Sequence, residues 1–228
     1  RLHALPSGAL YWPAQRTLVV SDLHLGKAAR QAVQGGALLP PYETRETLSR
    51  LSADLEVTDP AHVICLGDSF DRAEADAELP EADKLWIARL QAGRDWTWIE
   101  GNHDPGPLSL GGAHRAELTL GPLVFRHIAT PGRTEEAAAE VSGHYHPKAR
   151  LALRGRSLSA ACFLVDARRL ILPAYGAYTG GLSCTAPVLA GLMGPDAQAI
   201  LTRLSGSGLN GSGGGRALAI PMPRGRGR

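Results

Sequence analysis

Short apolar runs alternate with amphipathic stretches in the first half of the chain, a pattern typical of β-strands joined by helices. Apolar runs predict strands at Thr17–Val20, His62–Leu66 and Asp95–Ile99. Leucines at helical spacing predict a helix over Tyr42–Val57, and a second helix is expected over Glu81–Ala92. The order strand, helix, strand predicts parallel crossover units, in which consecutive strands lie side by side in one sheet.

The second half of the chain is richer in strand patterns. A hairpin is predicted over Ala116–Leu120 and Leu123–His127, and short strands are expected at residues 149–153, 162–166 and 170–172. The segment Asp196–Leu204 predicts a last short helix. The two halves together indicate an α/β fold of two packed sheets flanked by helices.

Composition favours one globular domain with a tail. The chain has 228 residues, of which 44% are hydrophobic and 20% charged. Residues 1–204 are expected to form the domain, and residues 205–228, which are rich in Gly, Ser and Arg, a flexible tail. The formal net charge of +2 does not by itself demand a nucleic-acid partner.

The compartment is predicted from cysteines and apolar runs. Cys65, Cys162 and Cys184 lie far apart among apolar or small residues, which favours buried reduced thiols and a cytoplasmic protein. No apolar run approaches the roughly 18–20 residues of a membrane-spanning helix. No membrane partner is therefore expected.

Ligand-type residues follow the ends of all three predicted parallel strands. Asp22 and His24 are two apart, so in extended backbone their side chains point the same way. Asp68 follows Gly67 at the carboxyl end of the central strand, where open α/β sheets bind ligands, and its two oxygens can bridge two cations. The third strand ends in Asn102–Asp104. These side chains are expected to meet at one edge of the sheet.

Three histidines extend this set: His127 at the end of the hairpin, and His144 and His146, again two apart. A single Asp-x-His motif is a weak signal, since most such motifs are polar loops after a strand. The chain has five different motifs of this kind, each just after a strand: Asp-x-His, Gly-Asp-x-x-Asp-Arg, Gly-Asn-His-Asp, a lone His and Gly-His-x-His. Together they are a specific signal for a metal site. Carboxylate, amide and imidazole ligands without a thiolate favour Mn²⁺, Fe or Zn²⁺.

The motif set resembles the calcineurin-like metallophosphoesterase superfamily, with matches from Asp22 to His146. The resemblance implies a four-layer α-β-β-α sandwich of two facing mixed β-sheets and a pair of divalent metal ions bridged by Asp68. It implies one ion held by Asp22, His24, Asp68 and His146, and another held by Asp68, Asn102, His127 and His144. His103 would be catalytic beside the scissile phosphate, with Asp71 orienting it. Asp104 and Glu100 are candidates to orient the ligand imidazoles.

A closer resemblance is to the ligase-associated DNA damage response endonucleases, the PdeM or MPE type. The matching segments are residues 21–27, 38–42, 67–70, 101–105, 143–147 and 172–182. That family is bacterial and manganese-dependent, cuts DNA, and is encoded beside a DNA ligase and a helicase. The resemblance therefore implies DNA phosphodiester hydrolysis in repair, by a hydroxide bridging the two metals with assistance from His103. One departure is that Phe70 is followed directly by Asp71, where the close family usually has His-Asp.

The substrate contacts are less specific. Lys27, Arg30 and Arg72 lie beside the metal motifs and are candidates to contact DNA phosphates, as are Lys148 and Arg150, although a solvated charge is the better explanation for any single one of them. Three tyrosines are candidates to stack on bases of single-stranded DNA, with core packing expected for at least two of them: Tyr145, Tyr175 and Tyr178.

Two alternatives stay open. The same residues would serve a small-molecule phosphomonoesterase, a cyclic-nucleotide phosphodiesterase or a pyrophosphohydrolase. A non-enzymatic scaffold on the same fold fits less well, because such proteins usually lose ligands and here every ligand position is filled.

Overall fold

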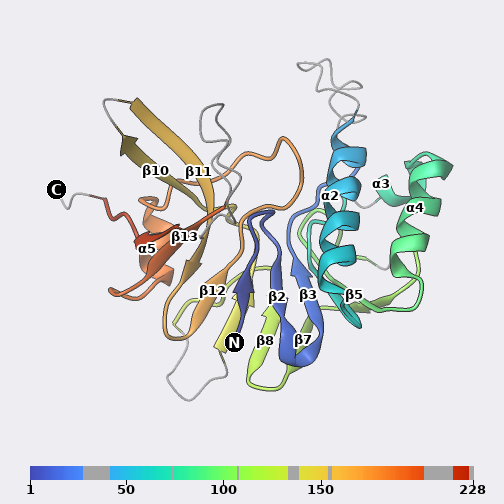
Figure 1. Cartoon of the computed structure of the whole chain (residues 1–228), viewed down its shortest axis with the longest axis horizontal. Coiled ribbons are helices and arrows are strands. Elements are labelled where there is room, and N and C mark those ends of the chain that lie inside the picture. Colours follow the sequence, from blue (N-terminus) through green and yellow to red (C-terminus); the bar gives the residue numbers. More distant parts are fainter. Residues whose placement is uncertain are drawn as a thin grey trace.

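The structure is a computed structural model that describes residues 1–27, 42–72, 74–106, 108–132, 139–153, 156–202 and 218–225. Two β-sheets lie face to face, with helices on their outer sides (Figure 1). The predicted α/β sandwich of two mixed sheets and flanking helices is confirmed. Among the described helices, none is long and apolar enough to cross a membrane.

The first sheet has the strand order β1-β2-β3-β4-β5-β6. Its strands are β1 (His3–Ala4), β2 (Leu10–Trp12), β3 (Thr17–Val20), β4 (His62–Leu66), β5 (Asp95–Ile99) and β6 (Ala113–Arg115), and a 3₁₀ turn η1 (Pro13–Gln15) joins β2 to β3. Strands β3, β4, β5 and β6 run parallel, so β3 to β5 end at the same edge. The three strands predicted in the first half are confirmed with the same bounds.

Helices α2 (Glu43–Thr58), α3 (Ala75–Glu78) and α4 (Glu81–Gln91) cover the outer face of this sheet (Figure 1). Both long helices were predicted to within about a turn. Alternate side chains of the strands pack against them, because successive strand residues point to opposite faces. This outer core includes Leu48, Leu51, Leu55 and Ile87 from the helices, and Leu18, Val20, Val63, Cys65, Trp96 and Trp98 from the strands.

The second sheet has the order β14-β13-β11-β12-β9-β8-β7, with β10 paired to β11. Its strands are β7 (Glu117–Leu120), β8 (Leu123–Arg126), β9 (Ala139–Ser142), β10 (Lys148–Leu153), β11 (Arg156–Val165), β12 (Arg169–Ile171), β13 (Gln198–Leu201) and β14 (Leu218–Pro221). The predicted hairpin is β7–β8. Helix α5 (Pro187–Leu192) packs on the outer face.

A central core joins the two sheets. It is formed by the strand residues that face away from the helices, among them Val19, Ile64, Leu66 and Ile99 from the first sheet and Phe125, Val141, Phe163 and Leu172 from the second. Strands β3 and β4 are thus buried on both faces, which explains why they are almost wholly apolar. A third core lies between the second sheet and α5.

Two sequence predictions fail at the carboxyl-terminal end. The expected helix over Asp196–Leu204 is instead β13, which pairs antiparallel with β11. Part of the expected flexible tail forms β14, which pairs with β13, and Met222 continues the contact by donating its N–H to Ala197 at 2.8 Å. A short apolar run at a free sheet edge gains backbone hydrogen bonds there. The predicted boundary at residue 204 falls outside the described residues.

Glu140 of β9 lies buried between two arginines. Its carboxylate oxygens are 3.6 Å from Arg126 Nε and 3.5 Å from Arg169 Nε. We expect Glu140→Ala to lower the free energy of unfolding by about 3 kcal/mol, because it leaves cationic groups without their buried counter-charge. Urea denaturation measures this loss. Glu117→Ala is the control: Glu117 also pairs with Arg126, but from an exposed position, so the expected loss is about 0.5 kcal/mol. Equal losses would contradict the prediction.

Candidate metal centre

The candidate ligands lie in loops that follow five strands. Those after β3, β4 and β5 carry Asp22 and His24, Asp68, and Asn102 with His103. The loops after β8 and β9 carry His127, and His144 with His146. The loops of the second sheet meet those of the first directly: the His144 N–H donates to Asp22 Oδ2 at 3.0 Å. The structure thus brings all seven proposed ligands together.

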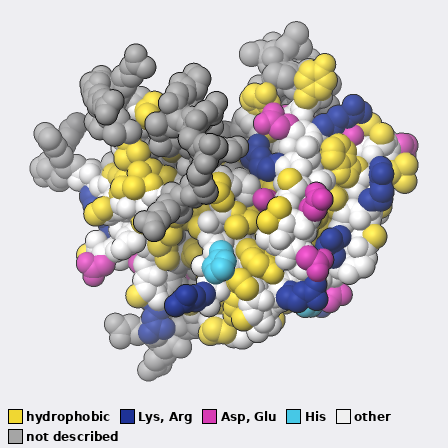
Figure 2. All heavy atoms as spheres, viewed as in Figure 1, with side chains coloured by type: hydrophobic (Ala, Val, Ile, Leu, Met, Phe, Trp, Pro, Cys, Tyr) yellow, Lys and Arg dark blue, Asp and Glu magenta, His cyan; other side chains and the backbone are white. Residues whose placement is uncertain are grey.

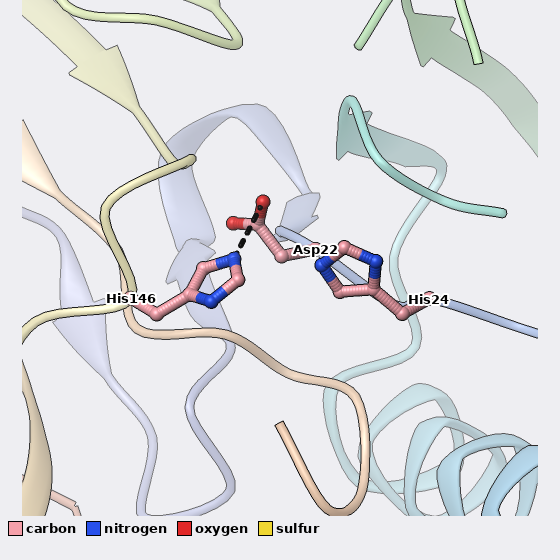
Figure 3. Close-up of side chains that lie close together, drawn as sticks. All are labelled: Asp22, His24 and His146. Carbon is pink, nitrogen blue, oxygen red and sulfur yellow. Dashed lines mark ion pairs between the residues drawn. The ribbon is translucent and has the colours of Figure 1, made fainter. Parts of the chain in front are cut away.

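Asp22, His24 and His146 form the first group of donors. One donor atom from each lies within 4.8 Å of the other two. Figure 3 shows the three side chains converging, with Asp22 Oδ1 3.1 Å from His146 Nε2. Asp22 is fully buried and His24 is 7% exposed, so these polar atoms are largely withdrawn from water.

Asp68, His127 and His144 form the second group, again with donor atoms within 4.8 Å of one another. His127 Nε2 is the central atom. It lies 3.3 Å from Asp68 Oδ2, 3.2 Å from His144 Nδ1 and 3.0 Å from Asn102 Oδ1. Asn102 therefore joins this group. The two groups adjoin, since Asp22 Oδ1 is 4.0 Å from His127 Nδ1.

The donors fit divalent cations. Both ring nitrogens of His24 are buried without a hydrogen-bond partner among the described residues, an arrangement that is unfavourable unless a ligand satisfies them. His127 Nδ1 lies 2.7 Å from the carbonyl oxygen of Leu66, which fixes the proton on Nδ1 and leaves the Nε2 lone pair for a metal. Together with the family resemblance, these groups indicate a dinuclear divalent metal site of nitrogen and oxygen ligands.

Unfavourable backbone geometry concentrates at this site. Eight non-glycine residues of the described chain have a positive φ, and five of them are proposed ligands: Asp22 (54°), His24 (46°), Asp68 (46°), His144 (70°) and His146 (46°). The left-handed region disfavours side chains by roughly 1–2 kcal/mol per residue. Such strain persists where the surrounding structure requires it, typically at functional sites.

Position 67 requires a glycine, because the backbone there packs directly against the ring of His127. It has a φ of +76°, and a Cβ there would lie 2.6 Å from His127 Nδ1 and 2.9 Å from the Gly101 Cα. We expect Gly67→Ala to displace His127, and so to lose bound metal and at least about tenfold of the activity. Metal analysis and steady-state kinetics measure both losses. Gly93→Ala is the matched control, because Gly93 has a φ of +74° but nothing within 4 Å of its Cβ position. The same loss in both variants would contradict the role of the His127 contact.

Asp104 has a different role from the expected one. Its carboxylate accepts backbone N–H groups from Asp68 (2.9 Å), Ser69 (2.7 Å), Phe70 (3.1 Å) and Gly101 (3.1 Å). It therefore shapes the turn that carries the proposed bridging ligand. Burial raises the pKa of Asp104 to about 6. The expectation that Asp104 or Glu100 orients a ligand imidazole is wrong for His127, whose acceptor is the backbone of Leu66.

His103 and Asp71 lie beside the first donor group. The expected contact between the Asp71 carboxylate and His103 is replaced by one from the backbone: His103 Nδ1 is 3.0 Å from the Asp71 carbonyl oxygen. The carboxylate of Asp71 instead faces His24, with 3.6 Å between Oδ1 and Nδ1. The bridge between Leu25 and Phe70 holds the chain after β4 alongside the chain after β3, which places Asp71 next to His24.

The carboxylates of the site are held ionised. Burial would raise the pKa of Asp22, but the hydrogen bond and positive charge of His146 outweigh it and lower the pKa. Burial would also raise the pKa of Asp68, but the hydrogen bond to His127 outweighs burial and lowers this pKa to about 2. The same contact raises the pKa of His127 despite burial, because it favours a second proton on Nε2, and a metal bound at Nε2 would displace that proton. At neutral pH the site therefore presents two negative charges to cations.

The predicted substrate contacts stay predictions, and the structure shows only where their side chains lie. Arg72 forms an ion pair with Glu78, and Lys27 Nζ donates to the backbone oxygen of Tyr178 at 3.4 Å. Arg30 lies outside the described residues. At least two of the three tyrosines were predicted to pack in the core, and Tyr145 and Tyr175 are buried. Tyr178 is 52% exposed.

Sequence reasoning missed Arg50. It lines a cavity of about 630 Å³ together with Lys148 and His146. In the sequence, Arg50 reads as one more charge on the polar face of a helix, four residues after Glu46, and no local signal distinguishes it.

Comparisons with known proteins agree with the geometry. The sequence model of the family described as calcineurin-like phosphoesterase matches residues 15–153, which include every proposed metal ligand. The crystal structure of the Pseudomonas putida nuclease MPE is similar, with 30% sequence identity and a TM-score of 0.64, over 88% of this chain and 92% of that chain. No curated protein matches the sequence. The predicted resemblance to the superfamily and to the MPE type is confirmed.

Proposed function

Because this chain belongs to the calcineurin-like phosphoesterase family and is a metal-dependent phosphoesterase, we propose that it is a manganese-dependent endonuclease that hydrolyses DNA phosphodiester bonds. The observation that most supports hydrolysis is the pair of adjoining donor groups, built from Asp22, His24 and His146 and from Asp68, His127 and His144. The similarity to a structure described as a nuclease supports a nucleic-acid substrate.

Seven residues would hold the two metal ions, and His103 would act on the phosphate. One ion would be held by Asp22, His24, Asp68 and His146, and the other by Asp68, Asn102, His127 and His144. When bound, two divalent cations supply an acidified water and neutralise charge on the phosphate. His103 Nδ1 donates to the Asp71 carbonyl. In the imidazolium form Nε2 also carries a proton, which it would donate to a phosphate oxygen or transfer to the leaving oxygen.

The donor set limits the choice of metal, and the resemblance to the MPE type favours manganese within it. Imidazoles mixed with carboxylate and amide oxygens suit Mn²⁺, Fe or Zn²⁺ better than Mg²⁺, which prefers oxygen ligands and several waters. We propose Mn²⁺ as the working ion.

The setting of the reaction is also a proposal. We propose that single-stranded DNA is the partner, that the reaction serves DNA repair in a bacterial cytoplasm, and that a DNA ligase and a helicase act in the same process.

A nuclease assay across Mn²⁺, Mg²⁺, Zn²⁺ and Fe²⁺ tests the proposal. Single-stranded, duplex and nicked DNA are compared with small phosphomonoesters, cyclic nucleotides and pyrophosphates. We expect fastest cleavage of single-stranded DNA with Mn²⁺. Fast hydrolysis of a small ester without any DNA cleavage would establish the alternative of a small-molecule phosphoesterase, and no turnover with bound metal would indicate a scaffold.

A further inference from the structure

A cavity of about 630 Å³ opens beside the metal centre. His146, a proposed ligand of the first ion, forms part of its lining. Arg50 from α2, Lys148 from β10 and Tyr178 from the loop after β12 also line it. We name this cavity the His146 groove. Its volume is in the range of pockets that take one small organic ligand.

One wall of the groove is tied to the metal centre. The wall is the loop of residues 175–179, whose backbone N–H groups at Tyr175 and Gly176 donate to the carbonyl oxygens of Ser21 (2.8 Å) and Asp22 (3.0 Å). A Cβ on Gly176 would lie 2.2 Å from the Leu23 oxygen, so only glycine allows this approach. The groove and the first donor group are therefore parts of one rigid unit.

Basic side chains brace the same loop. Arg50 NH1 donates to the Tyr175 oxygen at 2.9 Å, and Lys148 Nζ donates to the Thr179 oxygen at 3.2 Å. Each of these contacts leaves further N–H donors of the same group available. Among the described residues that line the groove, the acidic one is Glu46, which is 3.5 Å from Arg50 NH2. The lining thus has one more positive than negative charge and suits an anionic ligand.

The basic residues of the groove can be compared with those on one face of the molecule. On the face shown in Figure 2, lysine and arginine side chains of the described residues are scattered among acidic ones and form no continuous basic stripe. The whole chain has a formal net charge of only +2. An extended duplex footprint needs many phosphate contacts along a surface, and the described residues of this face do not offer such a row.

We infer that the His146 groove binds the nucleotide next to the bond that is cut, in a single strand of DNA. Lys148 and Arg50 contact the flanking phosphate, and the half-exposed ring of Tyr178 stacks on the base. A base inside a duplex is paired and stacked, and must leave the helix before it enters such a recess. The groove is therefore a determinant of single-strand specificity, and this inference rests on the proposed function.

Binding without cleavage tests the groove. The probe is a fluorescein-labelled dT oligonucleotide, measured by fluorescence anisotropy with Mn²⁺ present and in a His103→Ala background, which is expected to keep its metal and to cut too slowly to disturb the measurement. We expect Tyr178→Ala to weaken binding about tenfold, because one base loses its aromatic partner, and Tyr178→Phe to restore it. We expect Lys148→Met to weaken binding and to reduce the slope of log affinity against log salt by about 0.7, the loss of one phosphate contact to a single strand.

Kinetics and controls separate the outcomes. Lys84→Met removes a cation from α4 and is expected to bind like the wild type. Cleavage of the oligonucleotide should show a raised KM in Tyr178→Ala and Lys148→Met. If the wild type cuts DNA but these variants bind it unchanged, or if duplex binds as tightly as the single strand, the groove inference is overturned and the proposed function stands. If the wild type hydrolyses bis(p-nitrophenyl) phosphate but neither binds nor cuts DNA, both are overturned.

Discussion

Asp68→Ala is expected to lose metal from both donor groups and to lower phosphodiesterase turnover by at least about a thousandfold. Asp68 Oδ2 lies 3.3 Å from His127 Nε2, and Oδ1 accepts the His103 N–H at 2.9 Å. The residue therefore belongs to the second group and also fixes the loop that carries His103. Its low pKa keeps it charged at neutral pH. Metal analysis of the purified variant, together with kcat for a small diester, measures both effects.

The control for Asp68 is a buried acid outside the site. Asp83 on α4 is 5% exposed and pairs with Arg45, so Asp83→Asn removes a buried carboxylate with no expected change in metal content. Asp68→Asn keeps the shape of the side chain and isolates the effect of its charge. We expect it to fold like the wild type and to bind metal far more weakly. Retention of two ions and full activity in Asp68→Ala would disprove the bridging role.

The first sheet and its ligands were predictable because each signal is local. The runs of β3 and β4 are almost wholly apolar, since both faces of these strands are buried, whereas β5 interrupts its tryptophans with Thr97. Once the three strands are known to be parallel, their carboxyl ends must share one edge, and the polar residues after each end must meet there. The residue types after each end then mark the candidates. Their directions could not be predicted from a spacing of two in extended backbone, because Asp22 and His24 have a positive φ, and His144 and His146 belong to different donor groups.

What the sequence could not predict depends on contacts between distant segments. β13 contains Ala and Leu, which also suit a helix, and its pairing with β11 decides its conformation. The role of Asp71 depends on the path of the chain after Phe70, which turns its carbonyl oxygen, and not its carboxylate, toward His103. Arg50 reaches the groove only because α2 packs beside the loop of residues 175–179.

His103→Ala is expected to keep its metal and to lose turnover by about a hundredfold to ten-thousandfold, the usual range for a general acid. The His103 side chain belongs to neither donor group. Its hydrogen bond to Asp68 comes from the backbone N–H, which alanine retains. The variant therefore separates catalysis from metal binding, in contrast to Asp68→Ala. Metal analysis and kcat on a diester substrate test the separation.

The leaving group identifies what His103 does. If it protonates the leaving oxygen, the loss in His103→Ala should be larger for an alkyl ester than for a p-nitrophenyl ester, whose leaving group needs no proton. An equal loss for both would favour stabilisation of charge on the phosphate instead. His62→Ala is the control, because His62 lies at the start of β4, at the opposite end of that strand from Asp68, and pairs with Asp95. The His103 ring lies edge-on to His24, with 5.4 Å between ring centroids, and so contacts a proposed metal ligand. If His103→Ala loses metal in parallel with activity, His103 supports the metal site and its separate catalytic role is disproved.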